Sequence, residues 1–557
     1  MEKPIDKKTN WMQIIGLFGG IIAAILVYIF FPSDAPEIVN SMDAAKEAMA
    51  KGKPLNTDSM AIAAAVAILM GVWWMSEAAT LAVTALLPLV LFPILGADTF
   101  KNVAAPYSND TIFLFMGGFI LALAMQKWNL HTRIAIAIVL MVGTSPRRLI
   151  AGFMVATGFI TMWVNNTATT IMMLPVGLSV LHLVEKLRNA PISGTVEGDM
   201  KHLDAISKQS TQGGVVNAIA HKGADVIKKV KERTSAFSTN FGISLMLGIA
   251  YAATIGSTGT MVGSTSTAFF VGHMQEVYGI EIGFGEWMLM GLPLSILMMA
   301  FCWFLLTFVI FPPEMKEIPG GKDVIREEYR KLGKITTAEI LVAIIFASGA
   351  FCWIFLGFIL RYFDIKVASL NSLIAISMAV LFFLIPANRS GERLIDWATA
   401  KTLPWDMLIL FGGGLALSAQ LSKTGLSLWI GHLVQNLDGL NIILIIVVVT
   451  ALVIFLTEIV SNTATAATFI PIIAGVALGL GYEGRDIMVV TIPVTLAAIY
   501  AFMLPVGTPP NAIAYGSGFV RMKDMIKAGF WLNIAGITII TLITCTMGMW
   551  AFGLKFH

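Results

Sequence analysis

The chain has 557 residues, of which 57% are hydrophobic and only 13% are charged, and its formal net charge is +3. A soluble globular domain carries about 25% charged residues, so this composition excludes an ordinary soluble protein. A net charge so close to zero gives no reason to expect a nucleic-acid partner.

Apolar runs of about 18 residues or more, long enough to cross a bilayer as helices, follow one another along the chain. The first, residues 11–32, has no small-residue cleavage site behind it, so we expect a retained anchor rather than a signal peptide. The runs are continuously apolar rather than alternating, which is typical of helices. Later runs and helices are predicted at 60–75, 78–94, 110–128, 237–255, 287–311, 340–360 and 531–552. We therefore predict an all-α polytopic membrane protein with about 11 transmembrane helices.

Lysines and arginines gather before the first apolar run and in the predicted loops 186–233, 312–336 and 389–401. Because short basic loops stay in the cytoplasm, we expect these stretches and the N-terminus inside and the C-terminus outside. The less basic stretches 33–59 and 480–486 are expected outside. The predicted location is the plasma membrane, with the lipid bilayer as a partner.

Two nearly identical polar segments lie within apolar surroundings. "VNNTATTIMMLP" covers residues 164–175, and "VSNTATAATFIP" covers residues 460–471. The first lies in the stretch 149–187, whose ends are both basic, so a re-entrant hairpin from the cytoplasmic side is predicted. The second lies in the stretch 441–481, whose ends are poor in lysine and arginine, so its hairpin is expected to enter from outside.

The two segments belong to a longer internal repeat with an offset of 296 positions. The aligned pairs include Asp110 with Asp406, Lys127 with Lys423, Asn166 with Asn462 and Pro175 with Pro471. A second offset, 244, aligns Gly263-Ser264-Thr265 with Gly507-Thr508-Pro509, and each of these triplets is predicted to break a spanning helix. Hairpins that enter from opposite faces make an inverted repeat, the architecture of many secondary transporters, which bind their substrate at the midplane.

The four breaks offer neutral polar groups at membrane depth, where such sequence must line a cavity or be buried in protein. Asparagine and threonine side chains and free helix N-termini can donate to an anion, and unwound carbonyls can bind a small cation. None of the breaks contains lysine or arginine. A single break is more often a kink or a cap, but four breaks in two related pairs indicate a site for a carboxylate or sulfate, with hard cations nearby.

Other polar residues in apolar segments are weaker candidates. Glu458 in the second hairpin aligns with Met162, so it lies outside the symmetric core, and a structural hydrogen bond and a coupling role both stay open. His131 and His182 fall near helix ends and are interpreted as interfacial. Residues 129–141 are amphipathic and could lie flat on the inner membrane surface.

Four stretches resemble the signatures of the divalent anion/sodium symporter family, whose members handle di- and tricarboxylates or sulfate. They cover residues 122–138, 143–175, 457–472 and 507–518, and the resemblance extends over nearly the whole chain. It implies a homodimer in which a transport domain slides across the membrane as an elevator against a scaffold domain that also forms the dimer contact. The scaffold would comprise 1–142 and 336–436, and the transport domain 143–335, which includes the cytoplasmic loop 186–236, and 437–557.

The resemblance also implies where substrate and ions bind. Substrate contacts would come from Asn165, Asn166, Thr167, Ser264, Thr265, Ser461, Asn462, Thr463, Thr508 and Pro509. One sodium site would use Thr161, Asn165, Asn166 and Gly263, and the other would use Thr457, Val460, Asn462 and Gly507. No cofactor is implied beyond Na⁺ as a coupling ion.

The first half departs from the family pattern, because Asn165 stands where a serine is usual and no Pro-Pro-Asn follows Gly263. An amide brings an NH₂ donor where a cation needs oxygen, so sodium symport and sodium-independent exchange of dicarboxylates both stay open.

The leading hypothesis is secondary transport of dicarboxylates such as succinate, fumarate, malate or 2-oxoglutarate. The alternatives are citrate or sulfate transport within the same family, and arsenite efflux or Na⁺/H⁺ antiport by a related one, which would need ionisable residues at the tips. The paired aspartates or Ser/His and metal motifs of an intramembrane hydrolase are not found, and no enzyme is expected. Direct use of ATP is not expected either, since no G-x-x-x-x-G-K loop occurs.

Overall fold

The computed structural model describes residues 11–41, 57–143, 145–188, 239–315, 321–389, 391–434 and 441–556. These residues form helices joined by short connections, and their isolated β-bridge joins Pro386 and Arg393. The predicted cytoplasmic loop 186–236 lies outside the described residues from position 189 onward. The same is true of the lysines before the first helix and of most of the predicted outer stretch 33–59.

Within the described residues, seven helices are long and apolar enough to cross a membrane, and five shorter apolar helices accompany them. This confirms the predicted polytopic α-helical class. The N-terminal helices are α1 (Trp11–Ile29), α2 (Ala35–Asn40), α4 (Thr57–Ser76), α5 (Leu81–Thr84), α6 (Leu87–Ile94), α7 (Phe100–Ala104), η1 (Ala105–Ser108), α8 (Asp110–Lys127) and α9 (Leu130–Val142). The middle of the chain contributes α16 (Phe284–Phe304), η3 (Leu305–Ile310), α17 (Gly321–Lys331), α18 (Thr337–Phe351), η4 (Cys352–Leu356), α19 (Gly357–Tyr362), α20 (Leu370–Leu384), α21 (Trp397–Ala400), α22 (Trp405–Lys423) and α23 (Leu426–Val434).

The helix predicted over 78–94 is interrupted, because α5 ends at Thr84 and α6 begins at Leu87. Pro88 has no N–H and cannot donate a helical bond to Thr84, which favours a break at this point. The carbonyl of Ala85 instead accepts a hydrogen bond from the Tyr107 hydroxyl. The prediction of one continuous span here was therefore wrong.

The amphipathic stretch 129–141 forms the separate helix α9, which packs against α10 and α17. His131 at its start is buried, and its Nδ1 lies 2.8 Å from the Met125 carbonyl oxygen. The interfacial position of this histidine stays a prediction. The ring closes the turn between α8 and α9.

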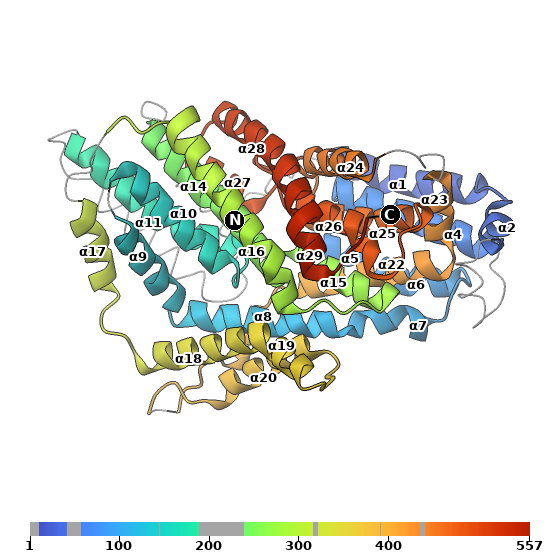
Figure 1. The fold of residues 1–557 in the computed structure, drawn as a ribbon, viewed down its shortest axis with the longest axis horizontal. Coiled ribbons are helices and arrows are strands. Elements are labelled where there is room, and N and C mark those ends of the chain that lie inside the picture. Colours follow the sequence, from blue (N-terminus) through green and yellow to red (C-terminus); the bar gives the residue numbers. More distant parts are fainter. Residues whose placement is uncertain are drawn as a thin grey trace, which may run out of the picture.

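The two predicted hairpins are present. The first consists of α10 (Pro146–Thr161) and α11 (Asn166–Arg188), and the second of α24 (Ile442–Thr457) and α25 (Asn462–Gly479). In Figure 1, α10 and α11 lie toward the left end of the molecule with α9 and α17, whereas α25 lies toward the right end with α4 and α23. The hairpins thus approach the middle from opposite ends, as an inverted repeat requires.

Two interrupted helices lie between the hairpins. The first is α14 (Asn240–Gly256), which continues as η2 (Ser257–Gly259), unwinds and resumes as α15 (Thr265–Tyr278). The second follows η6 (Gly484–Ile487) and consists of α26 (Met488–Ala497) and α27 (Pro509–Gly516). The chain ends with α28 (Met522–Ile543), η7 (Thr544–Gly548) and α29 (Met549–Phe552).

Each hairpin packs on the interrupted helix of its own half, α10 and α11 on α14, and α24 and α25 on α26. The approach of α10 to α14 requires glycine, because a Cβ on Gly256 would lie 2.4 Å from the Gly158 carbonyl oxygen. Small residues of this kind let membrane helices come close. Across the halves, α15 packs on α25 and α14 packs on α27, which brings all four breaks together.

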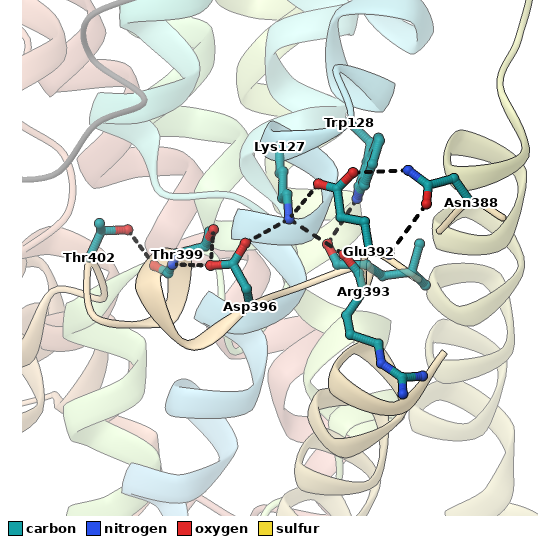
Figure 2. A network of polar contacts seen from close by, with 9 residues as sticks. Lys127, Trp128, Asn388, Glu392, Arg393, Asp396, Thr399 and Thr402 are labelled. Carbon is teal, nitrogen blue, oxygen red and sulfur yellow. Dashed lines mark hydrogen bonds and ion pairs between the residues drawn. The ribbon is translucent and has the colours of Figure 1, made fainter. Parts of the chain in front are cut away.

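The repeat is also visible in two lysine–aspartate pairs at the ends of α8 and α22. Lys127 Nζ at the end of α8 lies 2.9 Å from Asp396 in the segment before α22, as Figure 2 shows. Lys423 Nζ at the end of α22 lies 2.6 Å from Asp98 in the segment before α8. The two lysines are 296 residues apart and the two aspartates 298, so the two halves exchange matching contacts close to the repeat offset.

Candidate functional site

The first hairpin tip is held by threonine hydroxyls and backbone carbonyls. Thr161, fully buried at the end of α10, donates its hydroxyl proton to the Ala253 carbonyl oxygen at 3.0 Å. Thr260 in the unwound segment donates to the carbonyl of Met162. These bonds fasten the end of α10 to the first interrupted helix.

The side chains of Asn165 and Asn166 cap the N-terminus of α11. Their Oδ1 atoms accept from the backbone N–H of Thr167, at 2.8 and 2.9 Å respectively. An Asn side chain before a helix satisfies N–H groups that have no partner within the helix. All three residues are partly exposed.

The second hairpin tip has a different set of contacts. Thr457 donates its hydroxyl to Asn462 Oδ1 at 2.9 Å and lies 3.1 Å from the Ala498 carbonyl oxygen. The Asn462 amide Nδ2 donates to the Ile499 carbonyl at 3.0 Å. Asn462 is thus turned toward the unwound part of the second interrupted helix rather than toward its own helix N-terminus.

The two halves meet through hydrogen bonds that involve predicted substrate residues. The hydroxyl oxygens of Thr265 and Thr463 lie 2.6 Å apart, and the Ser266 hydroxyl donates to the Asn462 carbonyl at 3.2 Å. Thr265 begins α15 in the first half, whereas Thr463 lies in the first turn of α25 in the second. The breaks of the two repeats are therefore in direct contact.

Both glycines at the breaks occupy positions without room for a side chain. A Cβ on Gly263 would lie 2.4 Å from the Ser257 carbonyl oxygen, and a Cβ on Gly507 would lie 2.8 Å from Ala501 Cβ. In each case the chain folds back on the end of the preceding helical segment. A side chain at either position would therefore block this close return of the chain.

The remaining predicted residues are placed around these contacts. Ser264 is buried and its Oγ accepts from the Ser266 N–H at 3.3 Å, while Ser461 is partly exposed just before α25. Thr508 is buried with a hydroxyl that has no hydrogen-bond partner, and Pro509 is exposed in the first turn of α27. Val460 is buried. Thr457 is hydrogen-bonded to Asn462, whereas the hydrogen bonds between the described residues join Thr161 to neither Asn165 nor Asn166, so the first set of residues is brought together less closely than the second.

The structure adds contacts that sequence reasoning left open or missed. The carboxylate of Glu458 accepts from the backbone N–H groups of residues 502, 503 and 504, at 2.7 to 3.0 Å, and from Asn533 Nδ2 at 2.7 Å. Asn511 donates to the Ala501 carbonyl at 2.9 Å and the Leu504 carbonyl at 3.1 Å. The isolated Asn533 within the last apolar helix was the sequence signal that could have revealed its role.

A cavity of about 510 Å³ lies away from the tips, where α15 and α16 face α8, α19 and α20. Glu286 lies on its wall, with one carboxylate oxygen 3.0 Å from Arg361 Nη2 and the other 3.5 Å from Arg485 Nη2. Gln275 donates to Asp110 at 2.9 Å on another part of the wall. None of the predicted substrate or sodium residues lines this cavity.

Comparison with known proteins places the chain in a family. Residues 54–554 match the model of the sodium:sulfate symporter transmembrane region. The chain belongs to this family, the divalent anion/sodium symporters. It is 37% identical over 544 residues to the sodium-dependent dicarboxylate transporter SdcS of Staphylococcus saprophyticus, with 97% of this chain and 92% of that protein covered.

A second relative has the same name. The sodium-dependent dicarboxylate transporter SdcS of Staphylococcus aureus strain USA300 is 37% identical over 534 residues, which cover 95% of this chain and 90% of that protein. Among solved structures, the YdaH transporter of Alcanivorax borkumensis is 10% identical, with a TM-score of 0.46 and coverage of 81% of this chain and 87% of that one. Family membership therefore rests on the sequence matches.

Proposed function

We propose that the protein is a secondary active transporter of C4-type dicarboxylates without enzymatic activity. The observation that carries this proposal is the contact between Thr265 and Thr463, which joins a broken helix of one half to the hairpin tip of the other. The relatives named as sodium-dependent dicarboxylate transporters support the substrate class. Membership of the divalent anion/sodium symporters supports the transport mechanism in general.

The substrate would lie between the four breaks and contact neutral donors. Asn165, Asn166 and Thr167 would serve one carboxylate, and Ser461, Asn462 and Thr463 the other, with Ser264, Thr265, Thr508 and Pro509 completing the pocket. The helices α11, α15 and α25 begin at these residues, so their N–H groups and positive dipole ends face the anion. Neutral donors of this kind can release the anion on the other side more readily than a buried lysine or arginine could.

Sodium is proposed as the coupling ion, since both relatives are named as sodium-dependent. Hard cations prefer oxygen ligands. In the second set, Thr457, Val460, Asn462 and Gly507, the Thr457 hydroxyl already lies beside the Asn462 amide oxygen and the Ala498 carbonyl oxygen, which supports sodium binding there. The first set, Thr161, Asn165, Asn166 and Gly263, remains the weaker candidate because of Asn165.

The elevator mechanism and its two domains are also proposals. Residues 143–335 and 437–557 would move as the transport domain, because each hairpin packs on the interrupted helix of its own half and the two halves meet at the tips. Residues 1–142 and 336–436 would form the scaffold and the contact between two protomers. The N-terminus would lie in the cytoplasm and the C-terminus outside.

The test is uptake of labelled succinate into proteoliposomes. Asn462→Ala removes both the amide donor and the acceptor at the second tip, and we expect it to abolish uptake. Thr468→Ala is the matched control, since Thr468 lies farther along α25 and its hydroxyl has no hydrogen-bond partner. Undiminished uptake by Asn462→Ala would contradict the proposed site.

The same vesicles distinguish the alternatives. Unlabelled citrate or sulfate that competes more strongly than malate would favour those anions as substrates. Uptake that persists when choline replaces sodium, provided that dicarboxylate is present inside, would establish exchange in place of symport. We expect malate and fumarate to compete best and sodium removal to stop uptake.

A further inference from the structure

We propose that the two hairpin tips are specialised, so that the coupling cation binds at the second tip while the first supplies only hydrogen-bond donors to the anion. This inference rests on the proposed transport function and assigns different roles to its two mirrored halves. Three observations carry it: where the amide oxygens point, how the tip threonines are partnered, and where the buried charge lies.

At the second tip, three oxygen atoms from three segments converge. Thr457 Oγ1 lies 2.9 Å from Asn462 Oδ1 and 3.1 Å from the carbonyl oxygen of Ala498. Asn462 is held in this orientation because its Nδ2 donates to the Ile499 carbonyl, which fixes the amide oxygen on the side of Thr457. A hard cation can be bound by such a cluster when the hydroxyl proton turns away from it.

At the first tip, the corresponding amide oxygens face the backbone. Asn166, the counterpart of Asn462, and its neighbour Asn165 both accept from the N–H of Thr167. Because an N–H group can only donate, the atom facing it in each amide must be the oxygen, and each NH₂ group therefore lies on the other side. Thr161 keeps its bond to the Ala253 carbonyl but is joined to neither asparagine oxygen in the contacts of the described residues.

This difference changes which ligand the first tip suits. Two NH₂ groups beside the N-terminus of α11 favour carboxylate oxygens, whereas a cation would meet donors where it needs acceptors. If one amide oxygen turned toward a cation, the Thr167 N–H would keep one acceptor, and if both did, it would have none of its present acceptors. The first tip is thus complementary to the anion itself.

The distribution of charge points the same way. Glu458 is 3% exposed, and within the described residues no lysine, arginine or histidine forms an ion pair with it. A buried carboxylate without a cationic partner is costly even when it accepts several hydrogen bonds. Glu458 follows Thr457 directly in the chain. The Oε2 atom and the backbone oxygen of Glu458 would each lie 3.2 Å from a Cβ on Gly507. A cation bound at the second tip would therefore be the counter-charge of Glu458.

The matching position in the first half has no charge. Met162 replaces the glutamate, its carbonyl accepts from Thr260, and its side chain packs against Gly259, where a Cβ would lie 3.0 Å from Met162 Cε. An apolar side chain thus packs against the first break where a carboxylate organises the second. Of these two matching positions, only that of Glu458 attracts a cation electrostatically.

The experiment measures the sodium concentration for half-maximal succinate uptake by the full-length protein in proteoliposomes. Thr457→Val and Thr161→Val remove the equivalent hydroxyls while keeping the shape of the side chains. We expect Thr457→Val to raise the half-maximal sodium concentration by about tenfold or more, which corresponds to losing about 1.4 kcal/mol of binding, and Thr161→Val to change it much less. Equal effects, or a larger effect of Thr161→Val, would overturn the inference.

A second pair of variants isolates the charge. Glu458→Gln keeps the size of the side chain and an acceptor for the unwound segment but removes the negative charge, and Met162→Leu is its control in the other half. We expect Glu458→Gln to raise the half-maximal sodium concentration strongly and Met162→Leu to leave it unchanged. An unchanged sodium dependence in Glu458→Gln would refute the role of the counter-charge.

The result separates the inference from the function on which it rests. If the wild-type protein takes up no dicarboxylate at any sodium concentration, the proposed function fails, and a melting shift of the purified protein with succinate checks that it is folded. If the wild-type protein takes up succinate but both tips share the sodium dependence, only the specialisation of the tips fails. If sodium has no effect on that uptake, the proposed sodium coupling fails with it, while dicarboxylate transport stands.

Discussion

The two hairpin tips have almost the same sequence but differ in what their side chains contact. At the first tip, Asn166 caps its own helix, whereas at the second, Asn462 reaches the neighbouring interrupted helix. Behind them, Met162 packs as an apolar side chain while Glu458 accepts four hydrogen-bond donors. A duplicated backbone can therefore keep its geometry while single substitutions give its copies different chemistry.

The lysine–aspartate pairs show the opposite behaviour, because they keep the same contact in both halves. Lys423 pairs with Asp98, and Lys127 pairs with Asp396. These pairs lie at the ends of α22 and α8, away from the tips. Contacts that fasten the repeats together are thus shared, whereas the contacts of the asparagine side chains at the tips differ.

The largest expected effect is on the stability of the protein, and it compares substitutions at the matching positions Glu458 and Met162. Glu458→Met leaves three backbone N–H groups and the Asn533 amide without an acceptor, and each buried group left unpaired costs about 1–3 kcal/mol. We expect a large fall in the melting temperature of the purified protein. Met162→Leu, a change of similar volume, should cost less than about 1.5 kcal/mol. Similar melting temperatures for the two variants would contradict the difference between the tips.

A smaller difference is expected between the two glycines at the breaks. A Cβ on Gly263 meets a backbone carbonyl at 2.4 Å, whereas a Cβ on Gly507 first meets the Ala501 side chain at 2.8 Å. Backbone cannot move as easily as a side chain, so Gly263→Ala should abolish succinate uptake and Gly507→Ala should reduce it. Equal uptake by Gly263→Ala and the wild-type protein would show that the first break is looser than described.

The paired aspartates should differ in a further, smaller way. The Asp98 side chain is 5% exposed and bonds to Lys423 and Gln420, whereas that of Asp396 is 49% exposed. Asp98→Asn should cost about 1–3 kcal/mol, since its hydrogen bonds are to a charged acceptor. Asp396→Asn should cost at most about 1 kcal/mol, because solvent screens its pair. Melting temperatures measured side by side give the comparison, and the reverse order would contradict it.

The smallest expected effect is the acid dependence of these pairs. Burial alone would raise the pKa of Asp98, but hydrogen bonds from Lys423, Gln420 and other donors lower it to about 2. The hydrogen bond from Lys127 lowers the pKa of Asp396 to about 2 as well. Both pKa values are depressed, so the stabilisation is complete above the ordinary value of 3.8 and is lost as the pH falls toward 2.

Melting scans between pH 5 and pH 2 in the wild-type protein and in the double variant with Asp98→Asn and Asp396→Asn test this prediction. The wild-type melting temperature should approach that of the variant as the pH falls. A constant gap between the two would contradict the role of these carboxylates.

The sequence predicted the backbone of the site closely because the repeat is local and polar residues within apolar runs are conspicuous. The stretches 149–187 and 441–481 correspond to the hairpins Pro146–Arg188 and Ile442–Gly479. The sequence could not predict long-range contacts, because nothing in the chain order shows that Glu458 reaches residues 502–504 or Asn533. The break near Pro88 was missed because hydropathy alone does not reveal where a carbonyl finds another donor.

The most direct test of the account is a disulfide between the two tips. In a chain whose Cys302, Cys352 and Cys545 are replaced by alanine, Thr265→Cys and Thr463→Cys together should cross-link on mild oxidation, and succinate with sodium should change the rate. The pair Thr265→Cys and Thr468→Cys serves as the control. A cross-link that forms and responds to succinate is the predicted result, and failure to form it, or a rate indifferent to succinate, would contradict a substrate site where the mirrored halves meet.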